Sequence, residues 1–254
     1  MPKFMDVDAT EAGKTLHGFD YTSISVDKLG ATEYTVVTIV VDKTTSVRDF
    51  KDGLEKMIGA AVGSCRRSAR ALNLLVRVTA FNSTGIEEIH GFNLLGSIEP
   101  DDYVGTIHPG GITNLFAATM EAIETTNEYV QKLFDDERIC NANSIIFTIT
   151  DGDDNASGDI TEDTVKEGLQ AVGRSEVMES MDVILIGVND GDDYYQRTLG
   201  DFKDKAGLNE YMSMGDVTEE KLAKLANFVT ESVSSKSVNL GTGNPSQYIN
   251  TFKF

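Results

Sequence analysis

Three short apolar runs, each leading into acidic residues, constrain the fold of this 254-residue chain more than any other feature. They read YTVVTIVVD (34–42), SIIFTITDGDDN (144–155) and DVILIGVNDGDD (182–193). Short continuous runs rich in β-branched residues are typical of strands buried on both faces of a parallel sheet. A further strand is predicted at 74–82, and the mixed polar and apolar segment 85–98 indicates an edge strand.

Segments with helical periodicity separate these strands. Apolar residues recur at three- and four-residue steps over 47–69, 116–134, 162–178 and 222–233, the spacing of helices that bury one face. A short strand is expected at 210–215. Buried strands that alternate with amphipathic helices predict an α/β, doubly wound fold: a mostly parallel central sheet with one antiparallel edge strand and helices on both faces.

The chain is strongly acidic, with 41 Asp and Glu residues against 22 Lys and Arg and a formal net charge of −19. Such a field repels phosphate backbones and anionic lipid, so binding to nucleic acid or to a membrane surface is not expected. The same field attracts metal cations and basic partners. A purely solubilising role for the charge remains an equal alternative on composition alone.

Cysteine and histidine are too few and too scattered for a disulfide scaffold or a soft-ligand metal site. Cys65 lies on the predicted buried face of the first helix and reads as a small hydrophobic residue. The N-terminal residues lack the apolar core of a secretory signal, and no stretch approaches the ~20 apolar residues of a membrane span. We therefore expect a cytoplasmic, soluble protein.

The pattern of elements divides the chain into three parts. Residues 34–235 contain all the predicted strands and helices and form one domain, preceded by an extension over 1–33. Residues 236–254 are expected to form a polar tail, with linker-like composition over 234–247 and an aromatic end. The sequence indicates no oligomeric state.

Oxygen-bearing side chains follow the strands at one predicted edge of the sheet. Asp42, Thr44 and Ser46 come after the first strand, Thr113 stands where the second helix begins, and Asp151 follows the central strand. Ligands of open parallel sheets bind beyond the carboxyl ends of the strands. Carboxylates and hydroxyls are hard ligands that favour Mg²⁺, Mn²⁺ or Ca²⁺. The i, i+2, i+4 spacing of the first three residues allows one divalent ion to gather them.

DKTTS after a buried strand, GGITNL at the start of a helix and TDGDDN after a later strand resemble the metal-ion-dependent adhesion site of von Willebrand factor A domains. The resemblance covers roughly residues 34–235 and is closest to intracellular bacterial and phage members of the family. It assigns Asp42, Thr44 and Ser46 to the D-x-S-x-S motif, Thr113 to the lone threonine and Asp151 to the second-loop aspartate. Thr44 departs from the usual serine and adds a methyl group beside the ion.

This resemblance implies a non-catalytic module that binds a protein partner. Thr44, Ser46 and Thr113 would contact the ion, while two aspartates, Asp42 and Asp151, would hold it directly or through water. An Asp or Glu of the partner would take an open position, since a divalent ion with neutral ligands retains positive character. Because the chain carries −19, we expect slow association at low salt or a partner with basic residues around its acidic anchor.

Three other interpretations remain open. Asp, Ser and Thr are common helix caps and turn residues, so the three loops could be purely structural. The segment 151–162 approaches an EF-hand calcium loop from Asp151 to Glu162, with Ala156 where glycine is expected. A metal-dependent phosphohydrolase is the enzyme alternative, because Asp151 and Asp153 resemble the Asp-x-Asp loop of haloacid dehalogenase-type phosphatases, without its following hydroxyl residue.

Overall fold

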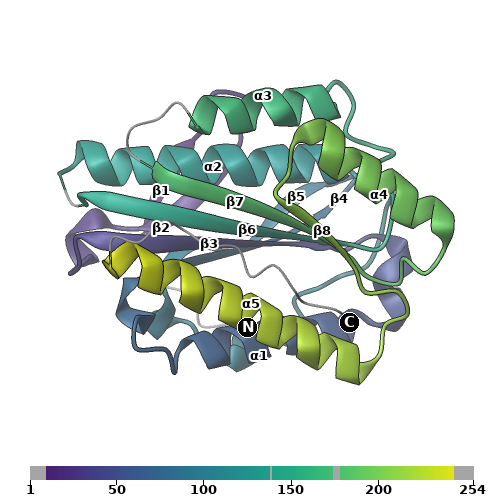
Figure 1. Ribbon diagram of the computed structural model, residues 1–254, viewed down its shortest axis with the longest axis horizontal. Coiled ribbons are helices and arrows are strands. Elements are labelled where there is room, and N and C mark those ends of the chain that lie inside the picture. Colours follow the sequence, from purple (N-terminus) through teal and green to yellow (C-terminus); the bar gives the residue numbers. More distant parts are fainter. Residues whose placement is uncertain (1–9, 138, 174–177, 243–254) are drawn as a thin grey trace.

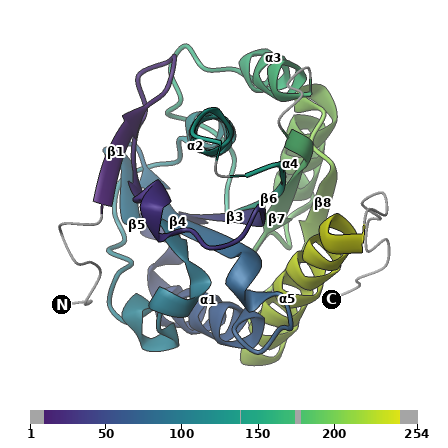
Figure 2. The same cartoon turned by 90° about the vertical axis from the view of Figure 1, so that its left-hand side faces the viewer.

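The computed structural model describes residues 10–137, 139–173 and 178–242. A single twisted sheet runs through the centre of the molecule between two layers of helices (Figures 1 and 2). Its eight strands follow the order β1-β2-β5-β4-β3-β6-β7-β8. The strands are β1 (Thr10–Lys14), β2 (Asp20–Ile24), β3 (Glu33–Asp42), β4 (Leu74–Asn82), β5 (Gly85–Leu94), β6 (Asn141–Thr150), β7 (Met178–Gly187) and β8 (Glu210–Ser213).

The helices divide between the two faces of the sheet (Figure 2). One face is covered by α1 (Lys51–Cys65) and α5 (Glu219–Thr242). The other is covered by α2 (Leu115–Asp135), α3 (Glu162–Val172) and α4 (Asp193–Ala206). Each face has its own hydrophobic core, which is why the central strands are apolar on both sides. In the described residues, no helix combines the length and apolar character needed to cross a bilayer.

The sheet is mixed and mostly parallel, as the sequence predicts. β3 pairs in parallel with both β4 and β6, and β7 joins β6 to β8 in parallel. The antiparallel strand expected within 85–98 is β5, which pairs with β4. β5 is not the last strand, however, because β2 lies beside it in parallel and β1 pairs antiparallel with β2.

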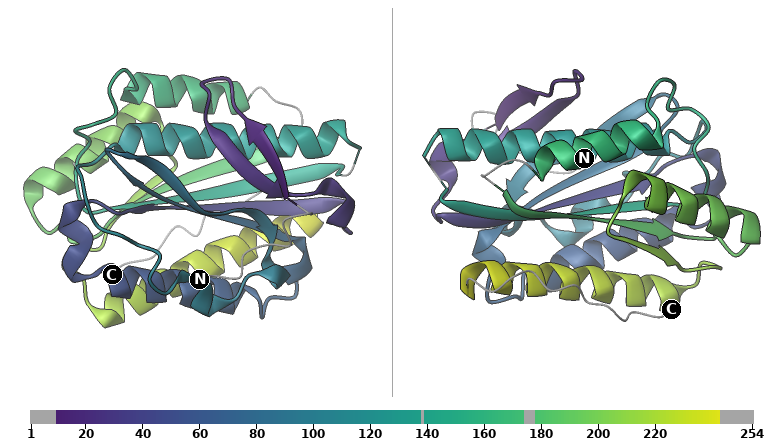
Figure 3. Two further views of the ribbon diagram at one scale, coloured as in Figure 1. Left: turned by 180° about the vertical axis from the view of Figure 1, so that it is seen from behind. Right: turned by 45° about the horizontal axis from the view of Figure 1, so that its top comes forward.

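The N-terminal hairpin therefore belongs to the sheet. Figure 3 shows this hairpin, formed by β1 and β2, beside α2. Tyr21 of β2 is buried and makes edge-to-face contacts with Phe92 and Tyr129. The described part of the expected 1–33 extension thus extends the folded unit, because an aromatic side chain anchors it to β5 and α2.

Three predicted helices have other boundaries in the structure. The helix expected over 162–178 ends at Val172, and Met178 begins β7. The first helix is interrupted at Phe50, where a 3₁₀ segment, η3 (Thr45–Asp49), gives way to α1, and α1 ends at the buried Cys65. The stretch that reads as a linker from residue 234 is helical up to Thr242. It remains helical because Lys236 is buried and forms an ion pair with Asp182 of β7. The aromatic C-terminal residues lie outside the described residues.

Candidate metal centre

The first predicted ligand, Asp42, ends β3 and is fully buried. Its Oδ1 accepts a hydrogen bond from the backbone N–H of Thr44 at 2.7 Å. Its Oδ2 accepts one from the hydroxyl of Thr150 at 2.7 Å. Parallel pairing sets this contact, since Val41 lies opposite Ile149 and so brings the ends of β3 and β6 to the same level. Both oxygens of the carboxylate are therefore fixed in place by the strand ends.

A chain of hydroxyl groups joins the first loop to the loop after β6. Thr44 Oγ1 and Ser46 Oγ lie 2.9 Å apart. The Ser46 hydroxyl donates to Asp151 Oδ1 at 2.8 Å. Thr44 and Asp151 are buried whereas Ser46 is exposed, so the cluster reaches solvent on the Ser46 side. Four of the five predicted ligands thus lie in one connected cluster.

Thr113, the fifth predicted ligand, comes from the third loop and borders this cluster. Its backbone N–H donates to Asn155 Oδ1 at 2.8 Å, and the backbone N–H of Asn155 donates back to the Thr113 carbonyl at 2.9 Å. A Cβ placed on Gly152 would lie 3.7 Å from Thr113 Oγ1. The Thr113 hydroxyl therefore lies beside the residue that follows Asp151.

Backbone contacts fix the third loop against the first. The N–H of Gly110 donates to the Lys43 carbonyl at 2.9 Å, and the N–H of Thr45 donates to the Gly111 carbonyl at 3.2 Å. Gly111 has φ +71°, and a Cβ there would lie 2.7 Å from Ser83 Oγ. Glycine is required at this position both by the left-handed conformation and by the close packing.

Sequence reasoning missed the residues that hold the loops together. Asp154 Oδ1 accepts from the N–H of Phe116 at 3.1 Å, and Ser157 Oγ accepts from the N–H of Ala117 at 2.9 Å. These are amides of the first turn of α2, which lack a partner inside the helix. The residue at the N-cap position, Asn114, makes no side-chain cap. The loop after β6 therefore caps α2 from a distance, a role that no local spacing indicates.

The same contacts separate the acids of the 151–162 loop. Asp151 bonds to Ser46, Asp154 caps α2 and Asp153 Oδ2 accepts from the hydroxyl of Tyr194 at 3.2 Å. Across the described residues, no three Asp, Glu, His or Cys side chains form a metal-binding group. The EF-hand-like arrangement is therefore not formed. The two acids of the phosphatase-like pair also have different partners, which disfavours the enzyme alternative.

No cationic side chain of the described residues balances the negative charge of the two aspartates in the cluster. Burial and, second to it, the nearby Asp42 carboxylate raise the pKa of Asp151 to about 6. Burial also raises the pKa of Asp42. The neighbouring Lys43 pairs instead with Glu87, and no ion pair to either aspartate is formed within the described residues. Two buried carboxylates and three hydroxyls form a donor set that fits a hard divalent cation.

The sequence matches no known family model, and no curated protein matches it. Its fold does match solved structures. A variant of the minor pilin PilB from Streptococcus sanguinis matches with a TM-score of 0.58 and 12% identity, covering 87% of this chain and 66% of that one. The pilus adhesin SpaC from Lactobacillus rhamnosus GG matches with a TM-score of 0.57 and 11% identity, covering 92% of this chain and 35% of that one. The chain has a von Willebrand factor A-like fold.

A third match to this von Willebrand factor A-like (VWA-like) domain is proximal thread matrix protein 1 from the mussel byssus, with a TM-score of 0.50 and 14% identity. It covers 80% of this chain and 47% of that one. The VWA-like domain thus spans less than two thirds of the pilus proteins. These neighbours are a minor pilin, a pilus adhesin and a thread matrix protein. At such low identity they establish the fold alone.

Proposed function

We propose that the VWA-like domain is a non-catalytic module that binds an Asp or Glu side chain of a partner protein through a divalent cation, Mg²⁺ or alternatively Mn²⁺ or Ca²⁺. The residues that would hold the cation are the two aspartates and three hydroxyl residues predicted from the sequence: Asp42, Thr44, Ser46, Thr113 and Asp151. One observation carries the proposal: two buried aspartates share a hydrogen-bonded cluster that has no counter-charge among the described residues.

The residues of the cluster have distinct tasks in this proposal. Asp42 is held by Thr44 and Thr150, so its carboxylate is pre-positioned and pays little ordering entropy on binding. Ser46 links the cluster to solvent and marks the side from which a partner side chain can approach. A bound divalent cation would supply a positive centre that attracts the carboxylate of the partner.

The partner is defined by charge. The chain carries −19, which repels an acidic surface over about one Debye length, ~8–10 Å at physiological salt. We propose that the partner presents one acidic residue within a basic surround, so that its surface is attracted while its anchor meets the cation. A cytoplasmic location is also a proposal from the sequence, and recovery of the native protein in a cell-surface fraction would contradict it.

Calorimetric titration with Mg²⁺ and with Mn²⁺ tests the metal site. Wild type should release or absorb heat with a saturating isotherm, and Asp42→Ala should not. Asp153→Asn is the matched control, because Asp153 belongs to the same acidic loop but bonds to Tyr194. Equal heats from wild type and Asp42→Ala, with both proteins folded by circular dichroism, would remove the metal from the proposal.

Capture of partners from the native host tests the interaction. Immobilised wild type should retain a protein in Mg²⁺ and lose it on addition of EDTA, and Asp42→Ala should retain none in either buffer. Asp153→Asn should behave as wild type. A partner that stays bound in EDTA and binds Asp42→Ala equally well would show that the interaction uses another surface.

A further inference from the structure

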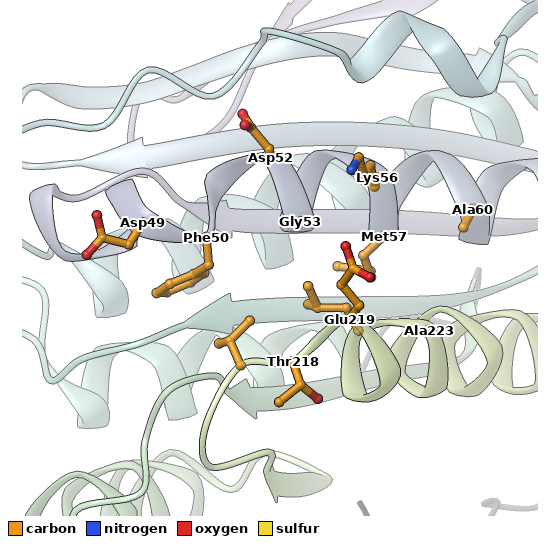
Figure 4. Close-up of a pocket in the computed structure, with 12 residues that line it drawn as sticks. Asp49, Phe50, Asp52, Gly53, Lys56, Met57, Ala60, Thr218, Glu219 and Ala223 are labelled. Atoms are coloured by element: carbon orange, nitrogen blue, oxygen red, sulfur yellow. The ribbon is translucent and has the colours of Figure 1, made fainter.

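A groove lies between α1 and the first turns of α5 (Figure 4). These two helices cover the sheet face opposite α2 (Figure 2). The volume of the groove is about 530 Å³. Figure 4 shows Phe50 and Met57 directed towards the space between the helices, with Glu219 beside it. The apolar lining residues are Phe50, Met57, Ala60, Val217, Leu222 and Ala223. The groove is separate from the aspartate cluster.

The groove exists because small residues line the seam between α1 and α5. A Cβ on Gly53 would lie 2.6 Å from Leu222 Cδ1, so α1 and α5 are in close contact at that point. Along the same seam Ala60 and Ala223 are exposed and carry only methyl groups. Short side chains on both helices leave the space between them unfilled, and apolar surface is therefore open to an occupant.

We propose that the segment YINTFKF (248–254) of the same chain occupies this groove, with Phe252 and Phe254 seated between α1 and α5. In an extended segment, residues two apart face the same side, so both rings would enter the groove while Lys253 faces its mouth. Two aromatic side chains supply the large apolar area that such a groove can bury.

Charge favours the same occupant. The groove is lined by three acids and one lysine: Asp49, Asp52, Glu219 and Lys56. Residues 243–254 contain one charged side chain, Lys253, and no acid. The only charged side chain of the segment is thus positive and stands between two aromatic residues, which suits a groove that is apolar within and acidic around it.

Length selects which residues of the segment reach the groove. From Leu222 to Thr242, α5 rises about 30 Å at ~1.5 Å per residue. Gly243, Asn244 and Pro245 are residue types that favour a reversal of the chain. After such a reversal, the nine residues from Pro245 to Phe254 span at most ~30–32 Å, the seven to Phe252 at most ~23–25 Å and the three to Tyr248 at most ~10–11 Å. Phe254 can therefore reach Leu222 and Phe252 the part of the seam just before it, whereas Tyr248 cannot.

The absence of tryptophan from the sequence provides a direct test. In Phe252→Trp the new side chain is the sole tryptophan, and we expect blue-shifted emission and several-fold slower acrylamide quenching than in Tyr248→Trp, the matched control on the same segment. Adding Ala60→Glu and Ala223→Glu places charge in the groove at two exposed positions. These changes should return the quenching of Phe252→Trp to the control rate, and circular dichroism verifies the fold.

Three outcomes would overturn the proposal. Equal quenching of the two tryptophan variants would show that the aromatic end does not dock, which leaves the groove to another protein. Protection that survives Ala60→Glu with Ala223→Glu would place the segment elsewhere on the chain. Protection that grows with protein concentration, together with a dimer in sedimentation, would show that the segment binds a second copy. Hydrogen exchange slowed at 50–57 and 217–223 in wild type, relative to Phe252→Ser with Phe254→Ser, provides independent support.

Discussion

Two regions of this molecule bury carboxylates in opposite ways. Beneath α2, Arg77 of β4 is 1% exposed and lies between Glu121 and Glu88, with N–O distances of 2.6 and 2.7 Å. At the carboxyl edge of the sheet, Asp42 and Asp151 are buried near one another, and no cation of the described residues joins them. The chain supplies the counter-charge in the first region and does not supply it in the second.

This difference indicates what each region is for. A buried ion pair fixes the position of its elements, and here it connects β4, β5 and α2. Two buried acids without a cation lower the stability of the folded chain, because burial disfavours their charged forms. Such a cost is typical of functional sites, where a ligand provides the missing interaction.

Removing the cation from the compensated region should have the largest effect. Arg77→Met keeps most of the side-chain volume but leaves Glu121 and Glu88 without their partner, so we expect a loss of about 3–5 kcal/mol in the free energy of unfolding. Urea denaturation followed by circular dichroism measures it. The double variant Arg77→Met with Glu121→Gln should recover part of the loss. A single variant that costs under about 1 kcal/mol would show that the ion pair is not a determinant of stability.

Removing an acid from the uncompensated region should raise the free energy of unfolding, whereas removing Arg77 lowers it. The pKa of Asp151 is about 6 in the folded chain against an ordinary 3.8. Between these values the folded chain keeps a proton that the unfolded chain releases, so metal-free stability falls as pH rises from about 4 to 6 and then levels. Asp151→Asn should remove the part of this fall that Asp151 causes, leaving the part due to the raised pKa of Asp42, and should raise stability at pH 7 by up to about 3 kcal/mol. Urea titrations in EDTA from pH 4 to 8 test it, with Asp153→Asn as a control that keeps the wild-type slope.

Without metal we expect Asp151→Asn to be more stable than wild type, and Mg²⁺ should reverse that order. A ligand that binds only the folded state stabilises it by about 1.4 kcal/mol at ten times its dissociation constant. Wild type should therefore gain in melting temperature as Mg²⁺ is added, whereas Asp151→Asn should not. Arg77→Met should gain as much as wild type, because its lesion is remote from the cluster. An equal gain in Asp151→Asn would place the cation elsewhere.

The two regions also differ in how far the sequence predicts them. The place of the candidate ligands at one edge of the sheet was predictable, because each follows a strand end or opens a helix and parallel strands bring those points together. Arg77 interrupts the apolar run 74–82, and nothing local to it shows that Glu121, 44 positions later, meets its guanidinium. Pairing of this kind depends on the packing of α2 over β4, which periodicity does not specify.

Similar reasoning explains the other differences. β1 contains a glycine at 13 and few apolar residues, so no strand pattern is visible there. Its place in the sheet depends on the contacts of Tyr21 with Phe92 and Tyr129. The polar composition after 234 favours a linker, yet the helix continues because Lys236 meets Asp182. In each case a contact between distant residues overrides the local signal.

The remote cap of α2 links the cluster to the stability of a helix. Ser157→Ala removes the acceptor for the Ala117 amide and should cost about 1 kcal/mol. Thr161→Ala is the matched control, since Thr161 accepts from Thr164 N and caps α3 within its own chain segment. Both variants should lose similar stability in urea, but only Ser157→Ala should weaken Mg²⁺ binding in calorimetry, because Thr113 stands just before α2. Equal affinity in both variants would show that the cap serves the helix alone.

The smallest effect should come from the methyl group of Thr44, the one departure from the D-x-S-x-S pattern. Thr44 is 2% exposed, so Thr44→Ser removes a buried methyl and should cost about 0.8 kcal/mol of stability. Because the hydroxyl remains within reach of Ser46, the Mg²⁺ affinity measured by calorimetry should stay within about threefold of wild type, less than 1 kcal/mol. Thr44→Val is the matched control, which keeps the methyl and deletes the ligand, and it should lose binding. A gain in Mg²⁺ affinity of about tenfold or more in Thr44→Ser would mean that the methyl group crowds the cation. The wild-type site would then bind Mg²⁺ more weakly than a site with the usual serine.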